Sequence, residues 1–130
     1  MRITLCGSTR FEPLFHEWNH KLACAGHTVY SLSLFGRELT DAGKDDKKTV
    51  TEAEKITLDL VHLNKILNSD AIVVINPGAY VGFSTSREIQ WARMHGKKLF
   101  WQEPATGSRG ATILLRPGDR PPAAIEPQSH

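Results

Sequence analysis

The sequence predicts one α/β domain in which a parallel β-sheet of four to five strands is covered by helices on both faces. Two observations carry this prediction. Short apolar runs alternate with segments of helical periodicity, and one run, Ala71–Ile75, contains no polar residue. A strand without polar alternation is typical of a sheet buried on both faces. Because strands that alternate with helices pair in parallel through crossovers, we expect a three-layer α/β/α architecture.

The first half of the chain predicts two strands, a helix and a long loop. Ile3–Cys6 is a buried strand that ends in the turn Gly7–Arg10. A helix follows this turn and ends at Gly26. Thr28–Tyr30 is the second strand, and the polar residues 32–48 form the long loop. The helix is predicted because its apolar side chains fall within an arc of about 100°, and these are Leu14, Phe15, Trp18, Leu22 and Ala25.

The second half continues the alternation and ends in a tail. We expect residues 1–106 to form the α/β domain, and 107–130 to form an edge strand and a partly disordered tail. The helix before the third strand is expected to bury the stripe Ile56, Leu60, Leu63 and Leu67. The expected elements are a helix over about Thr51–Asn68, strand Ala71–Ile75, a helix over about Thr85–Met94, strand Lys98–Trp101 and a fifth, edge strand over Ala111–Leu115.

Composition excludes several classes of function. A chain of 130 residues with 40% hydrophobic and 23% charged residues is typical of one globular domain. A net charge of +2 does not predict the strongly basic surface that binds a nucleic-acid polymer. No apolar run approaches the roughly 20 residues of a membrane span. Cys6 and Cys24 lie in apolar stretches without disulfide or metal-pair spacing. We therefore expect both to be buried free thiols of a cytoplasmic protein.

The turn after the first strand combines small, hydroxyl and cationic residues. In flavodoxin- and Rossmann-like sheets, ligands bind beyond the carboxyl ends of the strands, which places Gly7, Ser8, Thr9 and Arg10 at the binding edge. A helix N-terminus there attracts anions, and Arg10 adds a bidentate phosphate contact. The turn matches neither GxxxxGK[ST] nor GxGxxG. The alternative is that Thr9-x-x-Glu12 is simply a capping box.

A second turn at the same edge carries a carboxylate. Glu88 is expected in the first helical turn, where it can act as nucleophile or general base at a sugar carbon. The alternative is a capping box, because Thr85-x-x-Glu88 repeats the pattern of Thr51-x-x-Glu54. The residues expected to bind substrate or phosphate in this turn are Gly82, Ser84, Thr85 and Ser86.

Two further patterns involve histidine. Asp59 and His62 share one flank of a helix, either as an acid–base pair facing the cleft or as residues that border the core. His16-Glu17-Trp18-Asn19-His20 matches HExxH. However, both histidines fall opposite the apolar arc and face water, so we expect no zinc site there. We expect no metal or redox cofactor.

With these residues placed, the chain resembles the nucleoside 2-deoxyribosyltransferase superfamily, over roughly Met1–Glu103. It is closest to the branch of small 2'-deoxynucleoside 5'-phosphate N-hydrolases. Leu5–Arg10 resembles their first turn, which implies that Ser8 and Arg10 contact the 5'-phosphate. Ser69–Val74 resembles a strand of the family, and Glu88 follows Asp70 by 18 residues, the spacing of the family's catalytic glutamate.

The sequence also departs from the family pattern. His62 stands eight residues before Asp70, where the family has an aspartate that assists the leaving base, and Asp59 lies one turn earlier. Ser84 and Ser86 replace glycines of the family.

The resemblance implies an N-glycosidase that hydrolyses a (deoxy)nucleoside 5'-monophosphate through a glutamate nucleophile, in a homodimer whose active sites borrow residues from the neighbouring subunit. The alternatives are a deoxyribosyltransferase, a hydrolase of NAD-like dinucleotides and a non-catalytic nucleotide-binding module.

Overall fold

The computed structural model describes residues 1–33, 35, 38–39 and 49–104. In chain order the elements are β1 (Arg2–Gly7), the short 3₁₀ helix η1 (Thr9–Phe11), α1 (Glu12–Cys24), β2 (Thr28–Tyr30), β3 (Glu38–Leu39), β4 (Thr49–Val50), α2 (Glu52–Leu67), β5 (Ala71–Ile75), the 3₁₀ helix η2 (Pro77–Ala79), α3 (Phe83–Met94) and β6 (Lys98–Trp101).

The main sheet is parallel, with the strand order β2-β1-β5-β6. From β1 the chain first adds β2 on one side and then crosses over to place β5 and β6 on the other side. The direction of winding therefore changes between β1 and β5, and ligands of such sheets bind at this switch point, beyond the carboxyl ends of the strands. The prediction of a parallel α/β sheet is confirmed.

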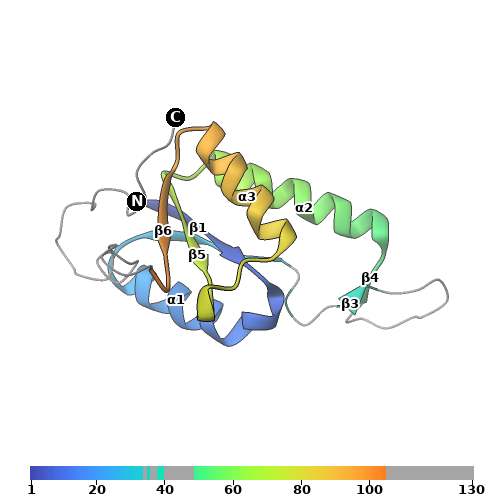
Figure 1. The fold of residues 1–130 in the computed structure, drawn as a ribbon, viewed down its shortest axis with the longest axis horizontal. Coiled ribbons are helices and arrows are strands. Elements are labelled where there is room, and N and C mark those ends of the chain that lie inside the picture. The colour runs from blue at the N-terminus through green and yellow to red at the C-terminus, as the bar shows by residue number, and fades with distance from the viewer. Residues whose placement is uncertain (34, 36–37, 40–48, 105–130) are drawn as a thin grey trace.

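Helices cover both faces of the sheet, as Figure 1 shows for α1 on one side and for α2 with α3 on the other. The α1 face buries a cluster around Phe15 and Leu22, and the opposite face buries one around Ile66 and Ile89. All five residues of β5 are buried, and neighbouring ones belong to different clusters because successive strand side chains point to opposite faces. The expected three layers are thus present.

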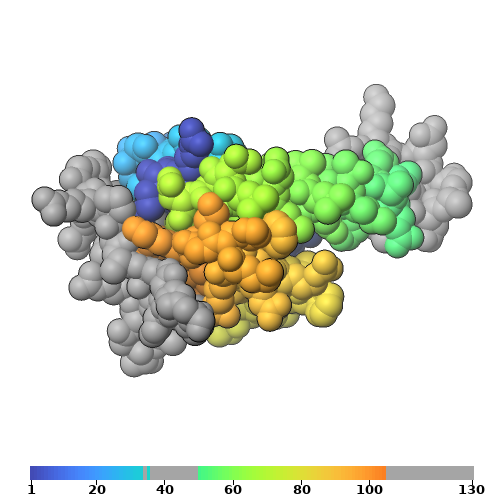
Figure 2. All heavy atoms as spheres, turned by 90° about the horizontal axis from the view of Figure 1, so that it is seen from above, coloured from blue at the N-terminus to red at the C-terminus, as the bar shows by residue number. Residues whose placement is uncertain are grey.

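The buried face of α2 differs from the expected stripe. His62 and Ile66 are buried, whereas Ile56 is 58% and Leu60 62% exposed, and Leu67 is also exposed. Figure 2 shows that much of α2 lies on the surface. The apolar spacing was therefore a misleading guide, because α2 turns a partly polar face toward the sheet.

Other expected boundaries also move. The helix expected from Thr85 begins at Phe83. Part of the expected long loop forms β3, which pairs in parallel with β4. Cys6 is buried as predicted, but the prediction for Cys24 is wrong, because its position on α1 leaves it exposed. Residues 40–48, the expected edge strand at 111–115 and the tail at 107–130 lie outside the described residues. None of the described helices is both long and apolar enough to cross a membrane.

Candidate active site

The candidate active site lies where β1 and β5 end side by side. Gly7, the last residue of β1, pairs with Ile75, the last residue of β5. A Cβ atom on Gly7 would stand 2.8 Å from the Ile75 carbonyl oxygen and 3.1 Å from the Phe15 ring. Real Cβ atoms do not approach a backbone oxygen so closely, and only glycine therefore lets the chain turn away from the sheet at this point.

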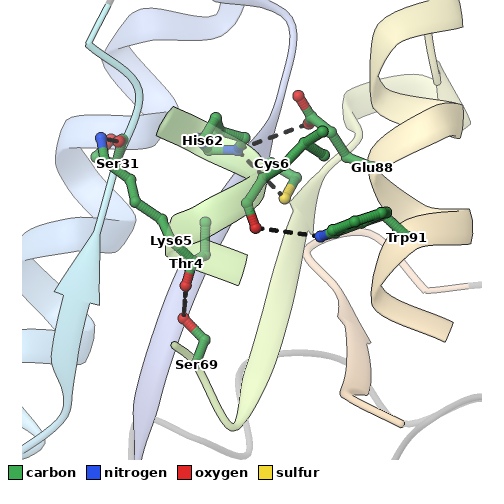
Figure 3. A network of polar contacts seen from close by, with 9 residues as sticks. Thr4, Cys6, Ser31, His62, Lys65, Ser69, Glu88 and Trp91 are labelled. Carbon is green, nitrogen blue, oxygen red and sulfur yellow. Dashed lines mark hydrogen bonds and ion pairs between the residues drawn. The ribbon is translucent and has the colours of Figure 1, made fainter. Parts of the chain in front are cut away.

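Three reactive side chains from three different elements converge beneath this edge, as Figure 3 shows. Cys6 comes from β1, His62 from α2 and Glu88 from α3. The Cys6 Sγ atom lies 3.6 Å from His62 Nε2, and the same nitrogen lies 3.7 Å from Glu88 Oε1. Cys6 is fully buried, His62 is 4% exposed, and the side chain of Glu88 is 16% exposed. The structure therefore brings together His62 and Glu88, and adds Cys6 to them.

Burial shifts the ionisation of the two titratable neighbours in opposite directions. Burial raises the pKa of Glu88 to about 7, because the charged carboxylate loses its hydration. Burial, assisted by the charge of Lys65, lowers the pKa of His62 to about 4. The imidazole is therefore neutral near pH 7, and its contact with Glu88 is not an ion pair. Carboxylates poised near neutral pH are typical of catalytic groups.

Hydrogen bonds fix the helices that carry these groups. On α3, one turn beyond Glu88, the Trp91 indole Nε1–H donates to the Leu63 carbonyl of α2 at 3.1 Å. On α2, Lys65 Nζ donates to the Ser31 carbonyl oxygen at 2.6 Å, which ties the helix to the segment after β2. Because both anchors lie within a turn of a site residue, they hold His62 and Glu88 in place.

The turn after β1 packs against the segment after β5. The Arg10 backbone N–H donates to Ser8 Oγ at 3.3 Å, and this bond caps η1. The Arg10 guanidinium lies 4.5 Å from the centroid of the Tyr80 ring, a cation–π contact. Thr9 and Arg10 are exposed at this edge. The N-cap of α1 is Phe11, without a side-chain cap bond, so the capping-box alternative for Thr9 is wrong.

The segment that carries Tyr80 is held by an acid beyond β6. Glu103 Oε2 accepts a hydrogen bond from the Gly78 N–H at 2.7 Å. The Asn76 side chain exchanges two further hydrogen bonds with the Glu103 backbone, at 2.8 and 3.0 Å. Ala79 adopts a positive φ of 63°, which costs free energy for a residue with a Cβ atom. These bonds offset that strain and keep Tyr80 beside Arg10.

The turn before Glu88 also differs from a capping box. Gly82 is the N-cap of α3 and makes no side-chain cap bond, while Thr85 lies within the first turn and is buried. The capping alternative for Glu88 is therefore wrong. Ser84 is exposed at the helix start. Ser86 lies two residues before Glu88, about 200° around the helix, and lines a hollow of the outer surface with Phe83 and Arg87.

Two sequence candidates lie away from the three buried groups. Asp59 is exposed, and its carboxylate accepts a hydrogen bond from Lys55 Nζ at 2.9 Å. The histidines of the HExxH pattern are exposed on α1, as the helical wheel predicted. His16 contacts Glu12 at 3.1 Å. His20 lies 3.6 Å from the Cys24 Sγ atom.

Sequence reasoning treated Cys6 only as a buried thiol and did not include Glu103, and it placed Asn76 and Tyr80 at the binding edge without giving Asn76 a role of its own. Cys6 precedes the Gly7 turn, and Asn76 directly follows β5. A position at a strand's carboxyl end was therefore the available signal for these two. No local signal marks Glu103, because its bonds join residues 25 and 27 positions apart.

No protein-family model matches this chain. No curated protein matches it either.

Several solved structures resemble most of this chain. The CMP N-glycosidase BcmB of Clostridium botulinum is 18% identical, with a TM-score of 0.50, covering 78% of this chain and 70% of its own. A 2-deoxyribosyltransferase from Bacillus psychrosaccharolyticus is 18% identical, with a TM-score of 0.54, covering 88% and 80%. A conserved protein from Enterococcus faecalis V583 is 19% identical, with a TM-score of 0.54, covering 86% and 69%.

These likenesses agree with the observed class of fold, a parallel sheet covered by helices on both faces. In particular, the chain shares its fold with a CMP N-glycosidase and with a 2-deoxyribosyltransferase.

Proposed function

We propose that this chain hydrolyses the N-glycosidic bond of a nucleoside 5'-monophosphate, a deoxynucleotide above all, with Glu88 as the nucleophile. The observation that carries the proposal is the placement of Glu88. Its carboxylate is buried at the switch point beside His62 and takes no part in a helix cap. A buried carboxylate with a raised pKa at the ligand edge is suited to attack on a sugar carbon.

The reaction follows the double displacement of a retaining glycosidase. The ionised Glu88 attacks the anomeric carbon, the bond from that carbon to the base nitrogen breaks, and its electron pair leaves with the base. The departed base takes up a proton from solvent. Water then attacks the same carbon, gives one proton back to solvent, releases the sugar phosphate and frees the carboxylate. His62 is neutral at pH 7, so its role is to orient the departing base through a hydrogen bond.

The phosphate is bound by groups of the two turns. Arg10 offers a bidentate cation and Ser8 a hydroxyl group, both at the end of β1. The first backbone N–H groups of α3 have no acceptor within their helix, and the positive end of the helix dipole adds to their attraction for an anion. Ser84, exposed at this start, supplies a further hydroxyl. Ser86 is left out because it lies on the far side of α3 from Glu88.

The structural neighbours support chemistry at the bond between base and sugar. One of them is named a CMP N-glycosidase and another a 2-deoxyribosyltransferase. A transferase would use the same Glu88 intermediate and would pass the sugar to a second base instead of to water. A nucleotide-binding module would keep Arg10 important but would not need Glu88.

A chromatographic screen tests this proposal. The purified protein is incubated with the common ribo- and deoxyribonucleoside 5'-monophosphates, with the matching nucleosides and with NAD. We expect release of free base from at least one monophosphate and much slower release from its nucleoside. Arg10→Ala should raise KM for the monophosphate and leave the slow nucleoside reaction unchanged, because the exposed guanidinium is proposed to contact the phosphate and not the sugar or base. If no substrate releases base, while a monophosphate still raises the Tm, the chain is a binding module.

We propose further that a second copy of the chain covers the exposed apolar stripe of α2. Ile56 and Leu60 are more than half exposed and Leu67 adjoins them on the same helix. Leu60 lies about 200° around the helix from the buried His62, so a partner packed on this stripe would cover the outer face of α2. We expect a dimer in sedimentation equilibrium, and Leu60→Glu should shift it to a monomer, whereas Glu52→Gln, at the exposed helix start, should not. A wild-type monomer at micromolar concentration would contradict this.

A further inference from the structure

We propose that Cys6, His62 and Glu88 form a binding site for a Zn²⁺ ion, and that zinc bound there blocks the nucleophile. The site itself follows from geometry, whereas the inhibition also rests on the function proposed above. The three ligand atoms, one thiol sulfur, one imidazole nitrogen and one carboxylate oxygen, all lie within 4.8 Å of one another.

The distance from His62 to Glu88 is too long for a hydrogen bond, and both distances from His62 Nε2 suit ligands of one ion. Hydrogen bonds between oxygen and nitrogen are about 2.7–3.2 Å long. Here His62 Nε2 stands 3.7 Å from Glu88 Oε1 and 3.6 Å from Cys6 Sγ. Two ligands of a tetrahedral zinc, bound at about 2.0–2.3 Å, stand roughly 3.3–3.6 Å apart.

A second observation is independent of these distances. Glu88 Oε1 is buried and has no hydrogen-bond partner among the described residues, although it faces the other two groups. A buried oxygen without a hydrogen-bond partner lowers the stability of the fold by about 1–3 kcal/mol. One explanation for such an atom in a folded protein is that it binds an ion. His62 and Cys6 are both more than nine-tenths buried. The three side chains are thus buried, their ligand atoms lie close together, and one of these atoms has no hydrogen-bond partner.

The donor types select the metal. Thiolate and imidazole are preferred by zinc over magnesium or calcium, which take oxygen ligands. Three protein ligands and an open fourth position are the arrangement of an accessible zinc site. The ion enters past Glu88, the one partly exposed member. On binding, the Cys6 thiol proton passes to solvent and the sulfur binds as thiolate.

Bound zinc opposes the proposed reaction. A Glu88 oxygen that coordinates zinc has lost the electron density it needs to attack the anomeric carbon, and the ion fills the space beside it. His62, as a ligand, can no longer turn toward a departing base. We therefore infer that zinc is a reversible inhibitor of this site.

The sequence contains a matched control for this site. Cys24 Sγ and His20 Nε2 are also 3.6 Å apart, but both residues are exposed on α1, and no carboxylate of the described part of the chain completes a cluster with them. If a nearby cysteine and histidine were sufficient, both pairs would bind zinc equally. We expect only the buried cluster to bind tightly.

The first measurement is optical and needs no substrate. Co²⁺ is titrated into metal-free protein, and we expect one equivalent to give the thiolate charge-transfer band of tetrahedral cobalt, which zinc then abolishes. Cys6→Ala should lose the band and Cys24→Ala should keep it. His62→Gln should weaken binding by more than the roughly 10- to 100-fold that follows loss of an outer-shell partner. Circular dichroism and Tm show whether each variant folds.

The second measurement uses the monophosphate cleaved most rapidly. Zinc should inhibit the wild type and Cys24→Ala alike, a chelator should restore activity, and Cys6→Ala should be at least about tenfold less sensitive. A missing cobalt band in folded wild type overturns the metal site, whatever the activity. A band without inhibition, or with zinc-dependent activation, overturns the inhibitory role. Zinc binding without any base release leaves the site intact and counts against the proposed function.

Discussion

The starts of α2 and α3 share a sequence pattern and use it in different ways. Both contain Thr-x-x-Glu, at Thr51–Glu54 and at Thr85–Glu88. At α2 the pattern is a true capping box, in which the Glu54 N–H donates to Thr51 Oγ1 at 3.1 Å and the Thr51 N–H donates to Glu54 Oε1 at 3.0 Å. At α3 neither bond forms, because the helix begins at Phe83, before the threonine.

Relative to the threonine, α3 starts three residues earlier than α2, and this shift changes what the glutamate does. At α2 the threonine is outside the helix, so the glutamate folds back on the backbone and remains in water. At α3 Thr85 is already helical and buried, and the next turn directs Glu88 toward β1 and α2. Gly82 supplies the N-cap instead, without a side chain that competes for the backbone. The same four-residue pattern therefore stabilises one helix and supplies a reactive group on the other.

The sharpest test of this comparison removes each carboxylate in turn. Glu88→Gln should lower kcat/KM for base release by at least about 10³-fold, because the amide cannot form the glycosyl intermediate. Glu54→Gln keeps an acceptor for the cap and should leave kcat/KM within about twofold. The measurement is initial-rate kinetics on the best monophosphate. Equal losses in both variants, or full activity of Glu88→Gln, would contradict the assigned difference.

The pH profile is expected to show the second largest effect. Since burial raises the pKa of Glu88 to about 7, the reactive carboxylate is fully present above that pH and is lost below it. In metal-free buffer, kcat/KM should therefore fall roughly tenfold per pH unit below about pH 7. The groups that act on this pKa are the Cys6 thiol, Lys55 and Arg87, which lower it, and Asp59, which raises it, while His62 beside it is neutral.

Two variants sharpen that profile. Asp59→Asn removes the negative charge that raises the pKa of Glu88, so the midpoint should move to lower pH. Lys55→Gln should move it to higher pH, by loss of a positive charge. A profile that is flat between pH 5 and 8, with rate limited by chemistry, would show that Glu88 does not titrate in the reaction.

The fold was predictable because its signals are local. Each strand of the main sheet is a short apolar run, and the glycines Gly7 and Gly26 end elements that the structure also ends nearby. The order of elements then restricts the sheet to parallel pairing with right-handed crossovers. Helix starts were less accurate, since a threonine at the expected start of α3 resembles a cap that the structure does not use.

The site was only partly predictable because it depends on how helices rotate and on residues distant in sequence. Cys6 and Glu88 are 82 positions apart, and no spacing rule joins them. The stripe of Ile56 and Leu60 predicted that α2 would bury its most apolar face, yet the helix turns His62 and part of Lys65 inward. A helix that directs a polar face at a sheet edge indicates a functional site, but this orientation can be recognised only in the structure and not in the sequence.

The smallest expected effect concerns the cap of α2. Thr51→Ala removes the acceptor for the Glu54 N–H and should lower the free energy of unfolding by about 1 kcal/mol, a factor of about five in the folding equilibrium. Thr51→Ser should restore most of it, because the hydroxyl is kept. Chemical denaturation measures both, with kcat/KM as the second readout. A Thr51→Ala variant that keeps its stability but loses activity would mean that the start of α2 contributes to the reaction, and the contrast with α3 would no longer hold.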